Sequence, residues 1–278
     1  MSNWFNALRG RVHRTLATAA TVVLAVSIAG CGGGGTTPEA VFQLDRRALP
    51  ADFTTRVTVN YSPYREATNP AELAAEDITL AEIEQDLRLV RAAGIGMIRL
   101  FSSRAFGDKV LSVIRSQGLD LKVQLGAYVL NPANGSGVEA DNQAELAETV
   151  RLANVYSDIV KAVSVGNETM VYWSTLAIPP ATMAGYIRQV RNAVPQPVTT
   201  NDNWAFWADA PNNVLSVVDF AAVHTYPLLD TFYDRALLDW RQKSALEAQR
   251  ADAMMDAAIA EAKLQFGKAR AYLDRAGL

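Results

Sequence analysis

Cysteine and histidine are almost absent from this sequence, which has one cysteine and two histidines in 278 residues. One cysteine cannot form an intrachain disulfide, and so few thiols and imidazoles exclude a Cys-based or His-rich metal centre. An excess of positive charge is also missing. The formal net charge is -3, whereas nucleic-acid binding usually needs a basic face. No Gly-rich loop follows the first apolar run, where Asn60-Tyr61-Ser62-Pro63 stands, and this argues against a nucleotide site.

The N-terminus has the pattern of an export signal followed by a lipid-attachment site. Three arginines within residues 9–14 precede an apolar stretch over residues 16–30, which is short for a membrane span. The only cysteine, Cys31, follows Ile28-Ala29-Gly30. This run is similar to a bacterial lipobox, a resemblance that implies cleavage before the cysteine and acylation of its thiol. An ordinary signal peptide with a chance cysteine is the alternative. We expect residues 1–30 to be a signal peptide.

The expected mature protein is exported and held at the cell envelope by its lipid anchor. Each buried CH2 of an acyl chain contributes about 0.8 kcal/mol, so several chains on Cys31 give a stable anchor. Gly32 rather than Asp follows the cysteine, which implies the outer membrane if the cell has one. Residues 31–52, which begin with a glycine run, are expected to form the acylated cysteine and a flexible tether. The folded domain is expected over residues 53–278.

Short apolar runs alternate with amphipathic patterns of helical period along the domain. Repeated strand–helix order predicts parallel pairing and an α/β fold, and each apolar run turns polar at its end. A (β/α) barrel and a doubly wound open sheet both bind ligands at that edge. Only six strands are visible, whereas a barrel has eight. The strands are expected at 57–64, 97–103, 121–129, 160–168, 197–204 and 217–227, and the helices at 78–94, 144–160, 180–194 and 241–266.

The ends of these six runs resemble glycoside hydrolase family 17, the β-1,3-glucanase group of (β/α)8 barrels. The resemblance covers about residues 57–278 and rests on these segments, in this order: VNYSPYR, IRLFSS, KVQLGAYV, SVGNE, NDNW and DFAAVHTYP. It implies a TIM barrel, of which about six βα units are present here. It also implies a retaining, endo-glucanase-like hydrolase of β-1,3-glucan or a related β-glucan, without a metal or organic cofactor.

The resemblance implies two catalytic carboxylates, and this sequence carries one of them. Glu168, in Gly166-Asn167-Glu168, takes the place of the proton donor. The family nucleophile lies in a Gly-Glu-Thr-Gly-Trp-like run at the seventh strand, and no such run occurs here. We therefore expect a truncated chain that is inactive by itself. Asp202 is the best-placed substitute acid, ahead of Glu66 and Asp230, but the family pattern gives it no such role. Read without the family, Glu168 could instead satisfy the N-terminus of the following helix.

Polar side chains at other strand ends are candidates for orienting the carboxylates or the sugar. Asn167 resembles the family residue that bonds the sugar 2-hydroxyl, although a turn asparagine is the alternative. Tyr61 and Arg99 are expected to orient carboxylates, since a buried arginine needs a partner. His224 and Tyr226 are two residues apart on a strand and face the same side. For His224, a structural role in the core is an equal alternative.

Aromatic side chains at the strand ends are candidates for stacking on sugar rings. Phe101, Trp173 and Trp204 lie at or just past such ends, although plain packing explains any one of them equally well.

Three other functions remain open. The first is a β-1,3-glucan transglucosylase, which shares the covalent intermediate. The second is a non-catalytic glucan-binding lipoprotein, and the third is a related barrel enzyme acting on another β-glucoside or a β-mannoside.

Overall fold

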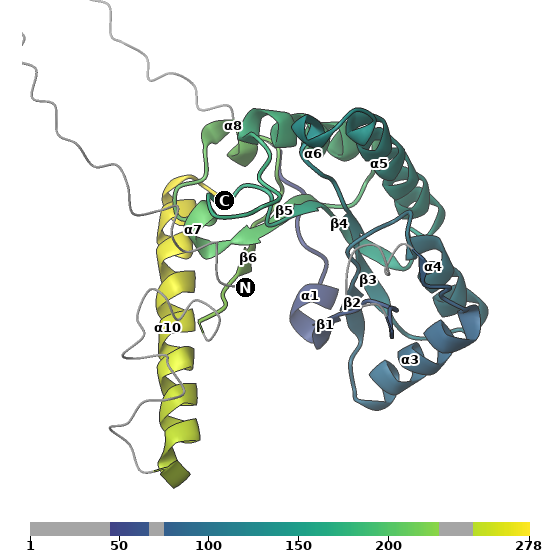
Figure 1. The fold of residues 1–278 in the computed structure, drawn as a ribbon, viewed down its shortest axis with the longest axis horizontal. Coiled ribbons are helices and arrows are strands. Elements are labelled where there is room, and N and C mark those ends of the chain that lie inside the picture. The colour runs from purple at the N-terminus through teal and green to yellow at the C-terminus, as the bar shows by residue number, and fades with distance from the viewer. Residues whose placement is uncertain (1–44, 67–74, 228–246) are drawn as a thin grey trace, which may run out of the picture. The chain divides into compact units, whose positions relative to one another are not determined.

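The computed structural model describes residues 45–66, 75–227 and 247–278. Its centre is one sheet of six strands in the order β1-β2-β3-β4-β5-β6, and every neighbouring pair is parallel. The sheet curls into a half-barrel, and the connecting helices lie along its outer side (Figure 1). The strands are β1 (Thr58–Asn60), β2 (Met97–Arg99), β3 (Lys122–Ala127), β4 (Val160–Asn167), β5 (Val198–Asn203) and β6 (Ala222–His224).

The helices begin and end at local signals in the sequence. Thr79 and Glu82 form a reciprocal capping box at the start of one of them, which satisfies two backbone donors, and a proline occupies the first turn of another. The helices are α1 (Asp52–Thr55), α3 (Leu80–Ala92), α4 (Gly107–Ser116), α5 (Val138–Val155), α6 (Pro180–Ala193), α7 (Trp204–Trp207), α8 (Asn212–Leu215) and α10 (Glu247–Arg275), with a 3-10 turn at Pro132–Asn134.

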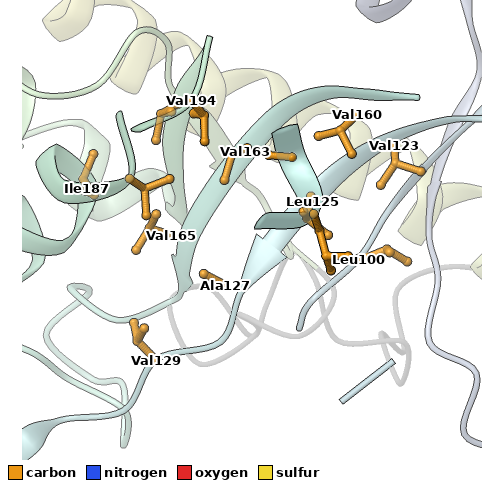
Figure 2. Packing of buried hydrophobic residues seen from close by; sticks show 14 of the residues in the cluster. Leu100, Val123, Leu125, Ala127, Val129, Val160, Val163, Val165, Ile187 and Val194 are labelled. Atoms are coloured by element: carbon orange, nitrogen blue, oxygen red, sulfur yellow. The ribbon is translucent and has the colours of Figure 1, made fainter. Parts of the chain in front are cut away.

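The two faces of the sheet differ in character. On the face that meets the helices, Leu125, Val163 and Val165 are fully buried, and Val165 lies beside Ile187 of α6 (Figure 2). On the other face the side-chain amides of Gln124 of β3 and Asn201 of β5 lie against each other, 3.0 Å apart. Because alternate residues of a strand face opposite sides, one face forms the core and the other carries polar groups.

The six-stranded α/β architecture predicted from the sequence is confirmed. The strands are shorter than expected. β1 and β2 end before the last polar residues of their runs, whereas β5 includes its polar residues 201–203 and β6 begins five residues after its expected start. The helix at 78–94 is found at 80–92 and that at 180–194 at 180–193, whereas α5 begins six residues before its expected start at residue 144. Helix α4 had no counterpart among the expected segments. Contacts with the folded domain begin at Asp45, whose backbone carbonyl accepts from Arg191 of α6 (2.6 Å), upstream of the expected start at Phe53. None of the helices in the described ranges combines the length and apolar character of a membrane span.

Candidate active site

Glu168 follows directly on β4 and has an unusual backbone conformation. Its φ is +51°, the only positive value among the non-glycine residues that the structure describes. An L-residue in this left-handed region costs about 1–2 kcal/mol, and such strain clusters at functional sites. The backbone N–H of Glu168 donates to the carbonyl of Asn201 in β5 (2.8 Å). The turn therefore fixes the direction in which this carboxylate leaves the edge of the sheet.

Three strands bring their terminal side chains together at this carboxylate. Oε1 of Glu168 lies 2.9 Å from Nδ1 of His224, at the end of β6. Nε2 of His224 lies 3.3 Å from Nη1 of Arg99, at the end of β2. Arginine carries only donors, so Nε2 of His224 accepts, and the ring proton sits on Nδ1 and is donated to Glu168. This assigns His224 as a neutral imidazole that connects a carboxylate to a guanidinium.

Arg99 is the buried centre of the cluster, with 7 % of its surface exposed. It donates to Oδ1 of Asn167, and its guanidinium lies over the ring of Phe101, 4.6 Å from the centroid. With its amide oxygen turned toward Arg99, Asn201 accepts from Nε (3.1 Å) and Nη2 (3.0 Å). Burial lowers the pKa of Arg99 to about 10, against the opposing influence of Tyr226 and Glu168. The side chain is therefore still a cation at neutral pH.

None of the carboxylates in the described ranges is ion-paired directly with Arg99. Its hydrogen-bond partners are the uncharged side chains of Asn167, His224 and Asn201. A buried cation among neutral partners is costly unless a negative charge lies nearby. The sequence predicted that the buried Arg99 needs a partner. The carboxylate in this cluster is Glu168, and it is connected to Arg99 through the imidazole of His224.

Asp202, the best-placed substitute acid, serves a different purpose. It is completely buried, and its two oxygens accept backbone N–H groups from Met170 (2.8 Å), Val171 (3.2 Å) and Asn203 (2.8 Å). Burial raises its pKa to about 7; the three N–H donors oppose that shift, and the charge of Glu168 adds to it. Asp202 therefore holds the loop that follows Glu168. Fully enclosed, it is not available to attack a substrate.

The other predicted side chains divide between this cluster and the packed layers. Tyr226 joins the cluster, because its ring lies edge-on to His224 with centroids 5.5 Å apart. Tyr61 lies elsewhere: its hydroxyl donates to Asp86 of α3 (3.0 Å), which places it between strand and helix. The Trp173 ring packs edge-on against exposed Tyr172, 4.6 Å away.

Trp204 begins α7 and faces the C-terminal helix. Nζ of Lys268, on α10, lies 5.2 Å from its ring centroid, and its indole N–H is buried with no hydrogen-bond partner in the described part of the chain. Trp204 is therefore tied to a helix contact as well as to the strand end. The contacts of Tyr61 and Trp204 do not bring them to Glu168, and their predicted roles in binding substrate stay predictions. Cys31 and Asp230 lie outside the described residues.

The sequence reasoning missed one buried carboxylate at the same edge of the sheet. Glu145 of α5 accepts from the backbone N–H groups of Ser103 (2.7 Å), Arg104 (3.2 Å) and Tyr128 (3.1 Å), and from the Ser102 hydroxyl (3.1 Å). It ties the loop after β2 to the loop after β3. A signal exists in the sequence, since three polar residues of α5 share one buried helical stripe: Asn142, Glu145 and Thr149.

Comparison with known proteins agrees with this geometry. A family model described as the BtgE/BtgC glycoside hydrolase domain matches residues 58–270. A search of curated proteins finds no match. Among solved structures, an endo-laminarinase from Formosa is 23% identical with a TM-score of 0.70, and the match covers 81% of this chain and 64% of that one. At this identity the likeness concerns the fold, and the chain spans less than two thirds of the laminarinase.

A second solved structure is more distant. The glycoside hydrolase family 17 β-1,3-glucanosyltransferase from Rhizomucor miehei is 18% identical with a TM-score of 0.48, and the match covers 74% of this chain and 68% of that one. An active-site mutant of the β-1,3-glucanosyltransferase from the same organism, in complex with laminaritriose, matches with a TM-score of 0.47 at the same identity and coverage. The predicted glycosidase barrel is confirmed by the family match and by the laminarinase fold.

Proposed function

Because this chain belongs to the BtgE/BtgC glycoside hydrolase domain family, we propose that it acts on β-1,3-glucan by a retaining mechanism with Glu168 as the proton donor. The chain carries a half-barrel of the laminarinase type. In such folds the substrate binds at the carboxyl ends of the strands. Glu168, His224, Asn167 and Arg99 all lie at or beside those ends.

The observation that carries this proposal is the hydrogen bond between Glu168 and His224 (2.9 Å). A proton donor must be held in one direction and remain accessible. The Glu168 side chain is 31% exposed while its partner is 11% exposed, so one side of the carboxylate is fixed and the other is open. Asn167, directly before it, is held by Arg99 and is suited to bond a sugar hydroxyl beside the reacting bond.

In the proposed reaction, Glu168 gives its proton to the glycosidic oxygen as the leaving sugar departs. It later takes a proton from the water, or from the acceptor hydroxyl, that attacks the glycosyl-enzyme intermediate. The intermediate forms on a second carboxylate about 5–5.5 Å from the first. Asp202 does not supply it, since it is enclosed and bound to three N–H groups. We therefore propose that the residues of this chain bind glucan but do not turn it over unaided.

The experiment follows the products of laminarin by mass spectrometry. It compares residues 32–278 with the same protein lengthened by the coding sequence that follows residue 278. The proposal is supported if only the longer protein turns over laminarin. In that protein Glu168→Gln should abolish turnover, and the control Glu84→Gln on α3 should leave it unchanged. Glu168-dependent turnover by residues 32–278 alone contradicts the proposal, because the nucleophile then lies inside this sequence. Transfer to sugar rather than water would identify a transglucosylase.

Binding of glucan without turnover in either protein favours the second candidate, a glucan-binding lipoprotein. The absence of an available second carboxylate next to Glu168 in the described ranges supports this alternative. For both functions we propose that the protein is exported and anchored in the envelope through acylated Cys31. The test is mass analysis of the mature N-terminus together with membrane fractionation of a Cys31→Ser variant. An unacylated N-terminus contradicts the anchor.

A further inference from the structure

A pocket lies at the carboxyl ends of β2 and β3, on the same edge of the sheet as Glu168. Its volume is about 430 Å3, within the range of roughly 300–1,000 Å3 for small-molecule sites. It lies between the loop after β2, the loop after β3 and the first turns of α5. The side chains that matter most for its chemistry are Ser102, Arg104, Tyr128, Leu130, Asp141 and Asn142.

The walls of this pocket are held in place by buried groups of α5. Glu145 holds both loops by accepting from three backbone N–H groups and from the Ser102 hydroxyl. Asn142 accepts from the N–H of Leu130 (2.9 Å) and donates to its carbonyl (2.8 Å). Binding sites are most effective when supporting hydrogen bonds fix their geometry before the ligand arrives. The pocket is therefore preorganised, and it is not merely a gap between mobile loops.

Tyr128 gives the pocket an aromatic surface with an unused polar group. The residue is 41 % exposed, and its hydroxyl forms no hydrogen bond within the described ranges, although the backbone N–H is bound to Glu145. Burial of the phenol raises its pKa, so the hydroxyl keeps its proton. Rings of this kind have an apolar body and a polar tip, which suits a sugar ring that has an apolar face and hydroxyls at its edge.

The charges around Tyr128 select an uncharged ligand. Arg104 is paired with Asp141 (3.3 Å), and Glu145 is a third charged group in the lining. Two carboxylates beside one arginine disfavour a phosphate or another anion, while the guanidinium disfavours a free cation. The Arg104 and Asp141 side chains are 47% and 77% exposed. Their hydrogen bonds to water can therefore be replaced by hydrogen bonds to the hydroxyl groups of a ligand. A neutral polyol fits this combination.

We propose that this pocket is a second sugar-binding position, which holds a glucosyl unit of the same β-glucan chain away from the Glu168 site. The inference rests on the proposed function and deepens it. Both sites lie at the carboxyl ends of parallel strands in one sheet, at β2 and β3 for the pocket and at β4 and β6 for the cluster. A glucan that spans both positions gains affinity only when it is long enough to reach the second one. The protein should therefore prefer longer oligosaccharides.

The test is calorimetric binding of laminari-oligosaccharides of increasing length to the full chain. Tyr128→Ala should weaken binding of the longest oligosaccharides about tenfold, as expected for an aromatic anchor, and leave the shortest unchanged. Tyr128→Phe keeps the ring and should retain most of the affinity. Phe266→Ala removes another exposed aromatic, from α10 (52 % exposed), and should change nothing at any length.

Two outcomes overturn the inference in different ways. If the unaltered chain binds β-1,3-glucan but Tyr128→Ala and Phe266→Ala bind every length equally, the pocket is not a sugar position and the proposed function stands. If the unaltered chain binds no β-1,3-glucan of any length, both the pocket assignment and the proposed function fail. Thermal unfolding of each variant shows whether a loss of binding reflects a loss of folding.

Discussion

The imidazole of His224 donates its Nδ1 proton to the carboxylate of Glu168 across 2.9 Å. The acceptor state of its other nitrogen is imposed by Arg99, which can only donate. One ring therefore joins the ends of β2, β4 and β6 at the proposed proton donor. Glu168 is oriented by a residue 56 positions away in the sequence, and the parallel sheet makes that contact possible.

His224→Ala should reduce the rate of laminarin cleavage by about 10- to 100-fold, because the carboxylate loses a charge-assisted hydrogen bond of about 1.5–3 kcal/mol. The measurement uses a form of the protein that turns over laminarin, and compares laminarin with an aryl β-glucoside whose leaving group needs no proton. The variant should lose rate on laminarin and keep most of its rate on the aryl substrate. Equal losses on both would show that His224 acts through folding or binding rather than through Glu168.

Glu145→Ala should destabilise the fold by about 3 kcal/mol, because it leaves three backbone N–H groups without an acceptor at about 1–3 kcal/mol each, partly recovered by water. Glu145→Gln keeps one acceptor oxygen and should cost about 1 kcal/mol. Denaturant unfolding measures both, with Glu84→Ala on α3 as the surface control. If Glu145→Ala unfolds at the same denaturant concentration as the control, water satisfies the loops and Glu145 is not their anchor.

The fold was predictable because it depends on a repeated pattern. Alternating strand and helix segments predict a sheet of parallel strands, whose polar ends lie on one edge. The apolar run before Glu168 placed this residue at the end of β4. Tyr61 shows where this reasoning stops. It follows the last residue of β1, so the alternation of a strand no longer gives its direction, and it turns toward Asp86 of α3 instead.

Long-range hydrogen bonds set the remaining limit on prediction. A glutamate in a helix normally indicates a solvent-facing position. The polar stripe of Asn142, Glu145 and Thr149 hints that Glu145 is buried, but it does not identify the four donors from two distant loops that surround the carboxylate. The same holds for Asp202, whose partners Met170 and Val171 lie in the loop after β4. Such contacts depend on the curvature of the sheet, which local residue patterns do not encode.

Asp202 should give the protein a component of stability that falls as the pH rises. Burial raises its pKa from an ordinary 3.8 to about 7. The folded state therefore binds this proton more tightly than the unfolded state. The stabilisation is complete below pH 3.8 and is lost as the pH passes through 7, with an upper limit of about 4 kcal/mol.

Asp202→Asn removes the titration, so urea unfolding of both proteins between pH 4 and pH 8 isolates this component. The variant is less stable by a constant amount, since its amide cannot accept from all three N–H groups. Because that loss of stability does not change with pH, it does not affect the comparison of the two pH dependences. We expect the unaltered protein to lose stability relative to Asp202→Asn as the pH rises. Parallel curves would mean that the three N–H donors outweigh burial and keep Asp202 ionised throughout.

Gly126 of β3 should not tolerate any side chain. A Cβ at this position would lie 2.2 Å from the carbonyl oxygen of Leu100 and 2.8 Å from that of Phe101. Both are backbone atoms in the two residues that follow Arg99, so relief of the clash requires the ends of β2 and β3 to move apart. Gly126→Ala should cost about 3 kcal/mol or more, at the upper end of the usual range for overpacking, and should disturb the Arg99 cluster.

The matched control for Gly126→Ala is Gly267→Ala in the middle of α10. A Cβ there meets nothing within 4 Å, so the change should stabilise the helix by about 0.5–1 kcal/mol. Thermal unfolding of the two variants should move in opposite directions. A Gly126→Ala protein that unfolds at the unaltered temperature would mean that β2 and β3 can separate freely at their carboxyl ends. The Arg99 cluster would then lack the rigid base that positions Glu168.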